Sequence, residues 1–195
     1  MVNYELILRK IQADPRYLEG VEYGKPRKGH QEGTIKAHIA DLEANLDRLS
    51  DVVTPEEYWK LKILIHTHDT MKKFAVSNSP IDDINSHASL ATEFLREFVE
   101  DTDLLAMVQW HDENFALWKQ MKFKGKYNQD RLFKRVMFIK DIELFLIFTL
   151  LDGFTPSKMA LADKEKPEKI RWFVQEVSQY RELPRMEMVL GLFNL

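Results

Sequence analysis

The chain has 195 residues, of which 45% are hydrophobic and 30% charged, so one domain can bury a core without a disulfide or structural metal. A net charge of −3, from 28 Lys and Arg against 31 Asp and Glu, excludes a protein that binds polyanions over its whole surface. There is no cysteine, which excludes disulfide frameworks, thiolate zinc sites and cysteine nucleophiles.

Apolar residues recur at helical spacing along most of the chain, and no segment alternates polar and apolar residues as a half-buried strand does. The expected helices cover about 4–11, 34–49, 55–73, 86–99, 103–110, 129–151 and 168–180. Turn-rich sequence occupies 14–33, and a basic connector precedes the helix that starts at 129. We therefore predict an all-α protein, with one domain over 1–195.

The sharpest start signal is Thr54-Pro55-Glu56-Glu57, which offers an N-cap, a proline at the first helical position and a glutamate at the third. The most apolar run covers 142–151, far short of the ~20 residues that a transmembrane helix needs. No signal peptide is visible at the N-terminus. We expect a cytoplasmic protein with no membrane partner.

Histidines and aspartates lie where a structural role is hard to assign. His38 falls on the apolar face of its helix, His68 continues an apolar stripe and is followed by Asp69, and Asp152 ends the most apolar run. A buried carboxylate is costly unless it is paired or binds a metal. Imidazoles and carboxylates together suit manganese, iron, cobalt, nickel, zinc or magnesium.

Two further histidines, His87 and His111, are expected at the ends of other helices. If they also ligate, a second metal becomes feasible about 3.5–4 Å from the first. Otherwise they support the ligands of a single ion. The sequence leaves both readings, one ion or two, open.

In chain order, His38, His68-Asp69 and Asp152 resemble the H…HD…D signature of the HD-domain metal-dependent phosphohydrolases. His87 and His111 are similar to the two intermediate histidines of many members. The segment 29–34 (Gly-His-Gln-Glu-Gly-Thr) is similar to the HD segment of bacterial CCA-adding enzymes. The resemblance covers about 29–155 and leaves about 156–195 as a C-terminal helical extension. No nucleotidyltransferase motif is present, so tRNA-end addition is not expected.

The resemblance implies a helical bundle with a divalent metal, one or two ions, at its centre, and hydrolysis of a phosphoester of a nucleotide or related small substrate. By motif position, His38, His68, Asp69 and Asp152 carry over as metal ligands. Asp69 would bridge to the attacking water or to a second ion, and His111 or His87 would protonate the leaving oxygen. Whether the substrate is a monoester or a diester is left open.

Lys72 matches the lysine of the common HDxGK variant and is expected to meet a substrate phosphate. The glycine of that motif is Met71 here, which we expect to narrow the mouth of the pocket. His30 and Glu32 either pack the preceding loop or touch the substrate, and we assign His30 to the substrate. His66 falls on another face of the helix from His68 and is expected to be structural.

Between Lys119 and Lys140 the sequence has eight basic residues and a single acid, Asp130, with aromatic residues among them. Such a segment is more often a solvated charged face, but it also suits phosphate chains and unstacked bases. In the second reading the candidate substrate contacts are Arg131, Lys134 and Arg135. The segment would suit a nucleotide-sized substrate or a polynucleotide, and of the two partners we expect the nucleotide.

Two hypotheses from different classes follow. The first is a metal-dependent phosphohydrolase, and the second is an HD-fold module that binds nucleotide or RNA with little or no turnover. The C-terminal aromatics Trp172, Phe173 and Phe193 are interpreted as core or as the contact of a homodimer.

Overall fold

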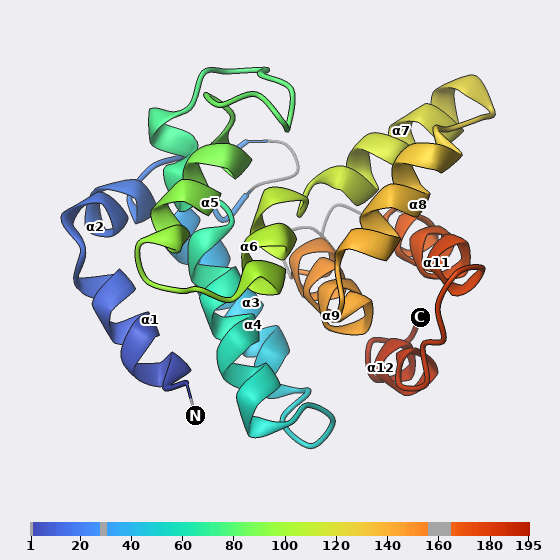
Figure 1. Ribbon diagram of the computed structural model, residues 1–195, viewed down its shortest axis with the longest axis horizontal. Coiled ribbons are helices and arrows are strands. Elements are labelled where there is room, and N and C mark those ends of the chain that lie inside the picture. The colour runs from blue at the N-terminus through green and yellow to red at the C-terminus, as the bar shows by residue number, and fades with distance from the viewer. Residues whose placement is uncertain (1, 28–30, 156–164) are drawn as a thin grey trace.

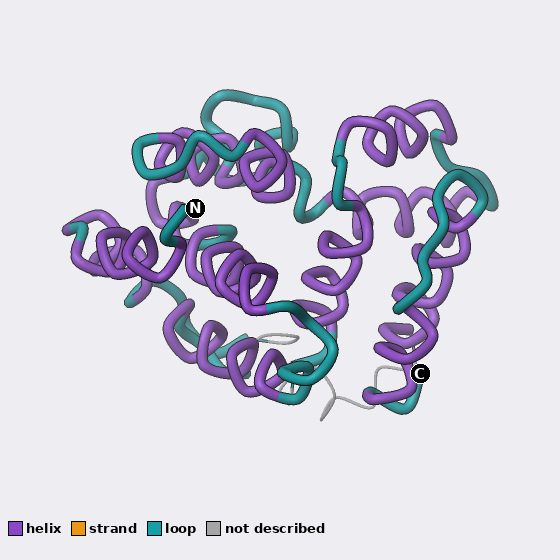
Figure 2. Tube along the Cα trace, turned by 60° about the horizontal axis from the view of Figure 1, so that its bottom comes forward, coloured by secondary structure: helices purple, strands orange, loops and turns teal. Residues whose placement is uncertain are grey.

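The computed structural model describes residues 2–27, 31–155 and 165–195, and these residues form a bundle of helices joined by loops (Figures 1 and 2). No β-strand occurs in the described residues, so the all-α expectation is confirmed. No helix among them is both long enough and apolar enough to cross a bilayer. The N-terminal part of the bundle comprises α1 (Tyr4–Ala13), α2 (Pro15–Val21), α3 (Ile35–Asp47), α4 (Pro55–Thr67), the 3₁₀-helix η1 (Thr70–Phe74), α5 (His87–Arg96) and α6 (Thr102–Gln109).

The C-terminal part comprises α7 (Glu113–Lys124), α8 (Gln129–Phe138), α9 (Ile142–Gly153), α11 (Glu165–Ser178) and α12 (Met186–Leu192). Helices α7 and α8 run side by side as an arm at one end of the molecule (Figure 1). The arm turns at Gly125, whose φ of 64° lies in the left-handed region where a glycine costs least. Helix α7 is supported from below by contacts with α11.

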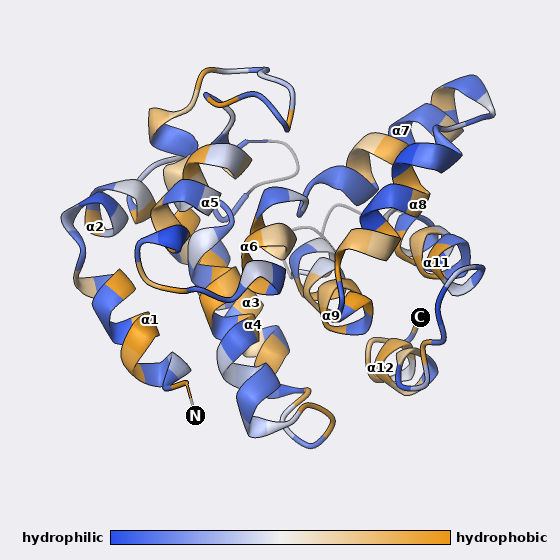
Figure 3. Cartoon of the chain, viewed as in Figure 1, coloured by the Kyte–Doolittle hydropathy of each residue, from blue (hydrophilic) through white to orange (hydrophobic). Residues whose placement is uncertain are grey.

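Helix α9 lies at the centre of the core. Apart from Asp152, every residue from Ile142 to Gly153 is buried, which explains why this helix is apolar on all its faces. Helices α3, α4, α11 and α12 all contact it, and they turn their apolar faces inward (Figure 3). One hydrophobic cluster contains buried residues from Tyr4 to Phe193, so both ends of the chain join the same core.

The capping signals in the sequence locate helix starts well. Thr54 and Glu57 form the expected capping box at α4, and Thr34 accepts a hydrogen bond from the amide of Ala37 at the start of α3. Ser86 caps α5 in the same way, and its hydroxyl accepts from the amide of Ser89. The last of these caps fixes the position of His87, the first residue of α5.

The expected continuous helix over 129–151 is wrong, because the chain breaks between α8 and α9. The side chain of Asp103, on α6, accepts hydrogen bonds from the backbone amides of Lys140 and Asp141. Asp141 then caps α9 by accepting from the amide of Leu144. A distant carboxylate thus supplies the hydrogen bonds that end one helix and start the next.

Other elements also differ from expectation, among them α12, which was not predicted as a separate helix. The turn-rich stretch contains α2, which Asp14 caps and Pro15 starts, and the basic connector is α7 with its turn. The helix expected to reach 73 ends at Thr67 and continues as η1. Gly20 lets α2 approach η1, because a Cβ there would clash with the carbonyl oxygen of Thr70.

Candidate metal centre

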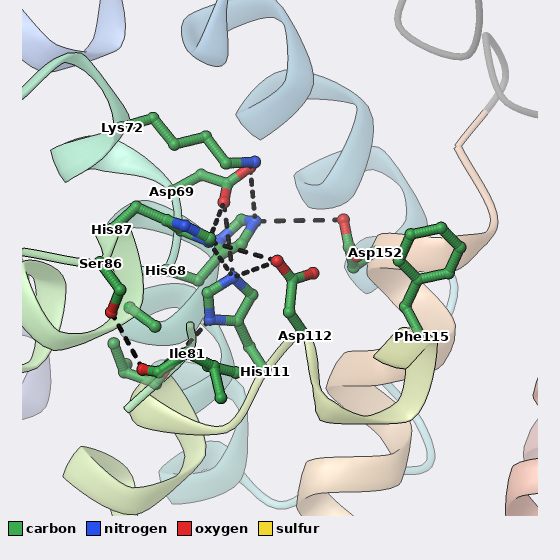
Figure 4. A network of polar contacts seen from close by, with 12 residues as sticks. His68, Asp69, Lys72, Ile81, Ser86, His87, His111, Asp112, Phe115 and Asp152 are labelled. Atoms are coloured by element: carbon green, nitrogen blue, oxygen red, sulfur yellow. Dashed lines mark hydrogen bonds and ion pairs between the residues drawn. The ribbon is translucent and has the colours of Figure 1, made fainter. Parts of the chain in front are cut away.

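Six side chains from distant parts of the sequence converge at one place. Figure 4 labels five of them: His68, Asp69, His87, His111 and Asp152. The six side chains form two groups of three, and within each group the ligand atoms lie within 4.8 Å of one another. The first group is His38, His68 and Asp152, and the second is Asp69, His87 and His111. Each group has the imidazole and carboxylate donors that can hold a divalent metal ion.

The first group joins α3, the end of α4 and the end of α9. His38 Nε2 lies 2.9 Å from Asp152 Oδ1, and His68 Nε2 lies 4.0 Å from the same oxygen. Both imidazoles are buried, whereas the Asp152 side chain is 26% exposed. Asn45 holds the end of α9 against α3 by donating to the carbonyl of Phe154, which brings Asp152 to His38.

The second group lies between the start of α5 and the loop after α6. The Nε2 atoms of His87 and His111 are 3.1 Å apart. Asp69 Oδ1 lies 3.8 Å from His87 Nε2 and 3.5 Å from His111 Nε2. His111 is buried, and the His87 side chain is 23% exposed. Two imidazole nitrogens thus face each other beside one buried carboxylate oxygen.

Asp69 connects the two groups. Its Oδ1 faces the second group, while its Oδ2 lies 3.5 Å from His68 Nε2 in the first. The backbone leaves the α-helical conformation at this point, since Asp69 has φ −110° and ψ −11° and begins η1. Consecutive residues therefore project into neighbouring groups. The expected set of four ligands contains Asp69, but the geometry places it with His87 and His111 as closely as with His68.

His68 is prepared as a ligand. Its Nδ1 donates to the carbonyls of Leu64 and Ile65, both at 3.1 Å, so the lone pair is on Nε2. Burial lowers its pKa to about 4, which keeps the ring neutral. His68 Nε2 and Asp69 Oδ1 are buried and have no hydrogen-bond partner among the described residues. Buried polar atoms are rarely left in this way, and these two fit a metal ion.

Protonated groups offset the Asp69 charge in the structure. Burial alone would raise the pKa of Asp69, but the ammonium of Lys72, which is hydrogen-bonded to Oδ2, brings it well below the ordinary range. Burial alone would lower the pKa of His111, but the carboxylates of Asp112 and Asp69 raise it to about 9. A metal at the second group would replace the proton of His111.

Two carboxylates near the site were not expected from the sequence to contact the metal-binding histidines. Asp112 Oδ2 lies 3.3 Å from His87 Nε2, and its position directly after His111 repeats the His68-Asp69 pair. The other is Glu32, whose Oε1 lies 3.5 Å from His38 Nδ1, on the side of the ring away from Asp152. Carboxylates in this position orient metal-binding imidazoles and increase their basicity.

Two cavities reach the site. A small one, of about 40 Å³, contacts His38, Asp69 and Lys72, with Lys25 and Arg27 at its rim. The second, which we call the basic cavity, has a volume of about 470 Å³ and is lined by His87 of the second group. The basic cavity is lined by Ser79, Pro80, Ile81, Asp82, His87, Asp112, Phe115, Ala116, Lys119, Arg131 and Arg135.

The other candidate residues fall as follows. Lys134 is exposed and does not line the basic cavity, and His30 lies outside the described residues. Met71 is buried in the core and lines neither cavity, so its expected narrowing of the pocket mouth is not seen. His66 has the expected structural role, because its Nδ1 is 2.6 Å from the Tyr17 hydroxyl.

Comparison of the chain with protein families, with curated proteins and with solved structures found no match. The resemblance to HD-domain enzymes therefore depends on the motif residues themselves. The structure adds that these residues, which lie as far apart in the chain as His38 and Asp152, meet at one place.

Proposed function

We propose that the chain is a metal-dependent phosphohydrolase of the HD type, acting on a nucleotide or a related small phosphoester. The observation that carries the proposal is that two buried atoms, His68 Nε2 and Asp69 Oδ1, make no hydrogen bond among the described residues, and each lies inside a group of three potential ligands. Burying such atoms without partners costs about 1–3 kcal/mol each, a cost that metal binding offsets.

His38, His68 and Asp152 would hold one ion, and Asp69, His87 and His111 a second. Nitrogen-rich ligand sets favour iron, manganese, nickel, cobalt or zinc over magnesium. When bound, divalent ions lower the pKa of a coordinated water and offset charge on phosphoryl oxygens. Asp69 would help to hold both ions, because one of its oxygens faces each group.

The remaining roles belong to side chains at the cavity walls. Lys72 lines the small cavity beside Asp69, where its ammonium can bind a phosphoryl oxygen once a metal has taken over the carboxylate. His87 lines the basic cavity, whereas His111 is buried behind it. If the second group holds no ion, His87 is thus the histidine that a leaving oxygen can reach as a proton donor.

Metal analysis and turnover test the proposal together. Protein purified without chelator or affinity tag should contain one or two equivalents of a transition metal, and should hydrolyse p-nitrophenyl phosphate, its bis ester or a nucleotide from a panel. Asp69→Ala should lose both metal and turnover. Asp130→Asn, which changes an exposed aspartate that lines neither cavity, is the matched control.

Protein without metal, even after soaking with manganese, iron or nickel, would contradict the hydrolase. Protein that binds metal and nucleotide but turns over none of the panel would support the alternative, a binding module of the same fold.

A further inference from the structure

The basic cavity has two chemically different ends. His87 and Asp112 belong to the end at the metal centre, and the walls formed by the α7–α8 arm carry Lys119, Arg131 and Arg135. Its volume, about 470 Å³, is in the range of sites for small molecules. A molecule in this cavity would have one part at the metal centre and another among three cationic side chains.

The arginines are held in place by a buried acid. Glu113 is 1% exposed, and Arg131 contacts both of its oxygens in a bidentate pair. Arg135 Nε lies 3.5 Å from the same carboxylate, and the Arg135 Cζ lies over the ring of Trp110, 3.3 Å from the ring centroid. The carboxylate and the ring fix the guanidinium groups before any ligand arrives, which lowers the entropic cost of binding.

Both arginines line the basic cavity as well as contacting Glu113, since their side chains are 31% and 26% exposed. Arg131 takes up both carboxylate oxygens, whereas Arg135 makes only the longer contact of its Nε with Glu113. The guanidinium of Arg135 is therefore the one that a ligand in the cavity can pair with most directly. Guanidinium groups bind phosphate oxygens in the same bidentate geometry that they use for carboxylates.

Helix α7 adds an ammonium group to the lining. The ammonium of Lys119 lies 4.4 Å from the centroid of the Phe115 ring, which holds it by cation–π attraction. Asp82 also lines the cavity and interacts with Arg131, so the wall is not uniformly positive. Asp112 belongs to the metal end, 3.3 Å from His87.

We infer that the basic cavity binds a second phosphate of the substrate, so that the natural substrate carries at least two phosphate groups. The scissile phosphate lies at the metal centre, and the other is held by Arg135 and Arg131 with Lys119 nearby. The inference rests on the proposed function for the scissile phosphate. It also gives Glu113 a purpose, as the positioning residue of both arginines.

Binding to the manganese-loaded protein tests the inference, with adenosine 5′-monophosphate, adenosine 5′-diphosphate and adenosine 3′,5′-bisphosphate as probes in calorimetry. The wild type should bind at least one two-phosphate probe about tenfold more tightly than the monophosphate. Arg135→Gln should remove this advantage, a loss of about 1.4 kcal/mol, because a charge-assisted hydrogen bond is lost. Lys124→Gln, an exposed cation on α7 outside the cavity, is the control and should keep the advantage.

Arg135→Gln leaves Arg131 on Glu113, so the buried carboxylate keeps its main partner and the variant should fold. Lys119→Gln tests the cation that α7 contributes to the cavity, and it serves if Arg135→Gln does not fold. Equal affinity of the wild type for all three probes would overturn the inference, as would equal effects of Arg135→Gln and Lys124→Gln. Binding of a short RNA that depends on Arg135, without a preference among the three probes, would also overturn it in favour of a nucleic acid.

Hydrolysis of p-nitrophenyl phosphate separates this inference from the proposed function, because that substrate has a single phosphate. If the protein hydrolyses p-nitrophenyl phosphate but binds the two-phosphate probes no more tightly than the monophosphate, the inference is wrong and the proposed hydrolase activity is supported. A preference that depends on Arg135, with no turnover of any probe, would support the subsite and contradict the hydrolase.

Discussion

Because the candidate ligands form two groups, replacing a single ligand should remove a defined part of the stabilisation that metal ions give the folded protein. Asp152→Asn should remove only the ion of the first group, and His87→Asn only that of the second. Asp69→Asn should remove both, because its two oxygens face different groups. A metal ion that binds only the folded state stabilises that state by about 2.7 kcal/mol when the free metal concentration is about 100 times the dissociation constant.

In a chain of this length, 1 kcal/mol shifts the melting temperature by about 2–4 °C. Each ion should therefore raise the melting temperature by about 5–10 °C, and two ions by about twice as much. Asp152→Asn and His87→Asn should each keep about half of the wild-type shift, and Asp69→Asn almost none. The half-exposed position of Asp152 makes its amide variant the least disruptive of the three.

The assay is differential scanning calorimetry of each variant, first with chelator and then with excess manganese. Comparing each variant with its own chelated form cancels any effect of the substitution on the metal-free fold. Asp130→Asn should behave as wild type. A full shift in Asp69→Asn would refute the bridging role of this carboxylate. Loss of the whole shift in both Asp152→Asn and His87→Asn would show that the two groups hold one shared ion.

Three further predictions concern the supports of the site. Glu32→Gln should weaken metal binding by about tenfold, because His38 loses the carboxylate beside its Nδ1. A competition titration with a chelating dye measures the affinity, and an unchanged affinity would show that Glu32 does not support the metal ligands. Gly20→Ala should cost about 1–3 kcal/mol in chemical denaturation of the chelated protein, since the new methyl group clashes with the carbonyl of Thr70. A neutral effect there would show that α2 can move away from η1. The pKa of His111 is about 6.5 in the unfolded chain and is raised to about 9 in the folded protein. Protonation of His111 therefore stabilises the chelated fold fully below about pH 6.5, and this stabilisation is lost as the pH rises through about 9. Melting curves of the chelated protein should show that loss for the wild type but not for His111→Asn.

The sequence predicts the fold where local signals decide it. Thr54 caps its helix as expected, and the helices expected from about 34 and 86 do start at the capping residues Thr34 and Ser86, because a cap depends only on the next few residues. The break between α8 and α9 depends on Asp103, 37 residues before Lys140, and no local pattern reveals that contact. Apolar periodicity continued across the break, so the two helices were expected to be one.

The candidate site shows the same division. Burial of His38 and His68 follows from their positions on apolar helix faces, and the structure confirms it. The split into two groups depends on the backbone change at Asp69, where a helix was expected to continue. The pairing of Glu113 with Arg131 also brings together different helices, and an acid at the start of α7 looks in sequence like any solvent-facing residue. Asp112 had a usable signal, since it follows a candidate ligand directly.

The α7–α8 arm has a consequence for how this protein could change over evolution. All six candidate metal ligands lie outside the arm, while Phe115, Lys119, Arg131 and Arg135 lie on it. The turn at Gly125 has open space around it, so residues can be inserted or exchanged there without disturbing a packed neighbour. Selection could therefore change which molecule the arm binds while the six candidate metal ligands stay unchanged.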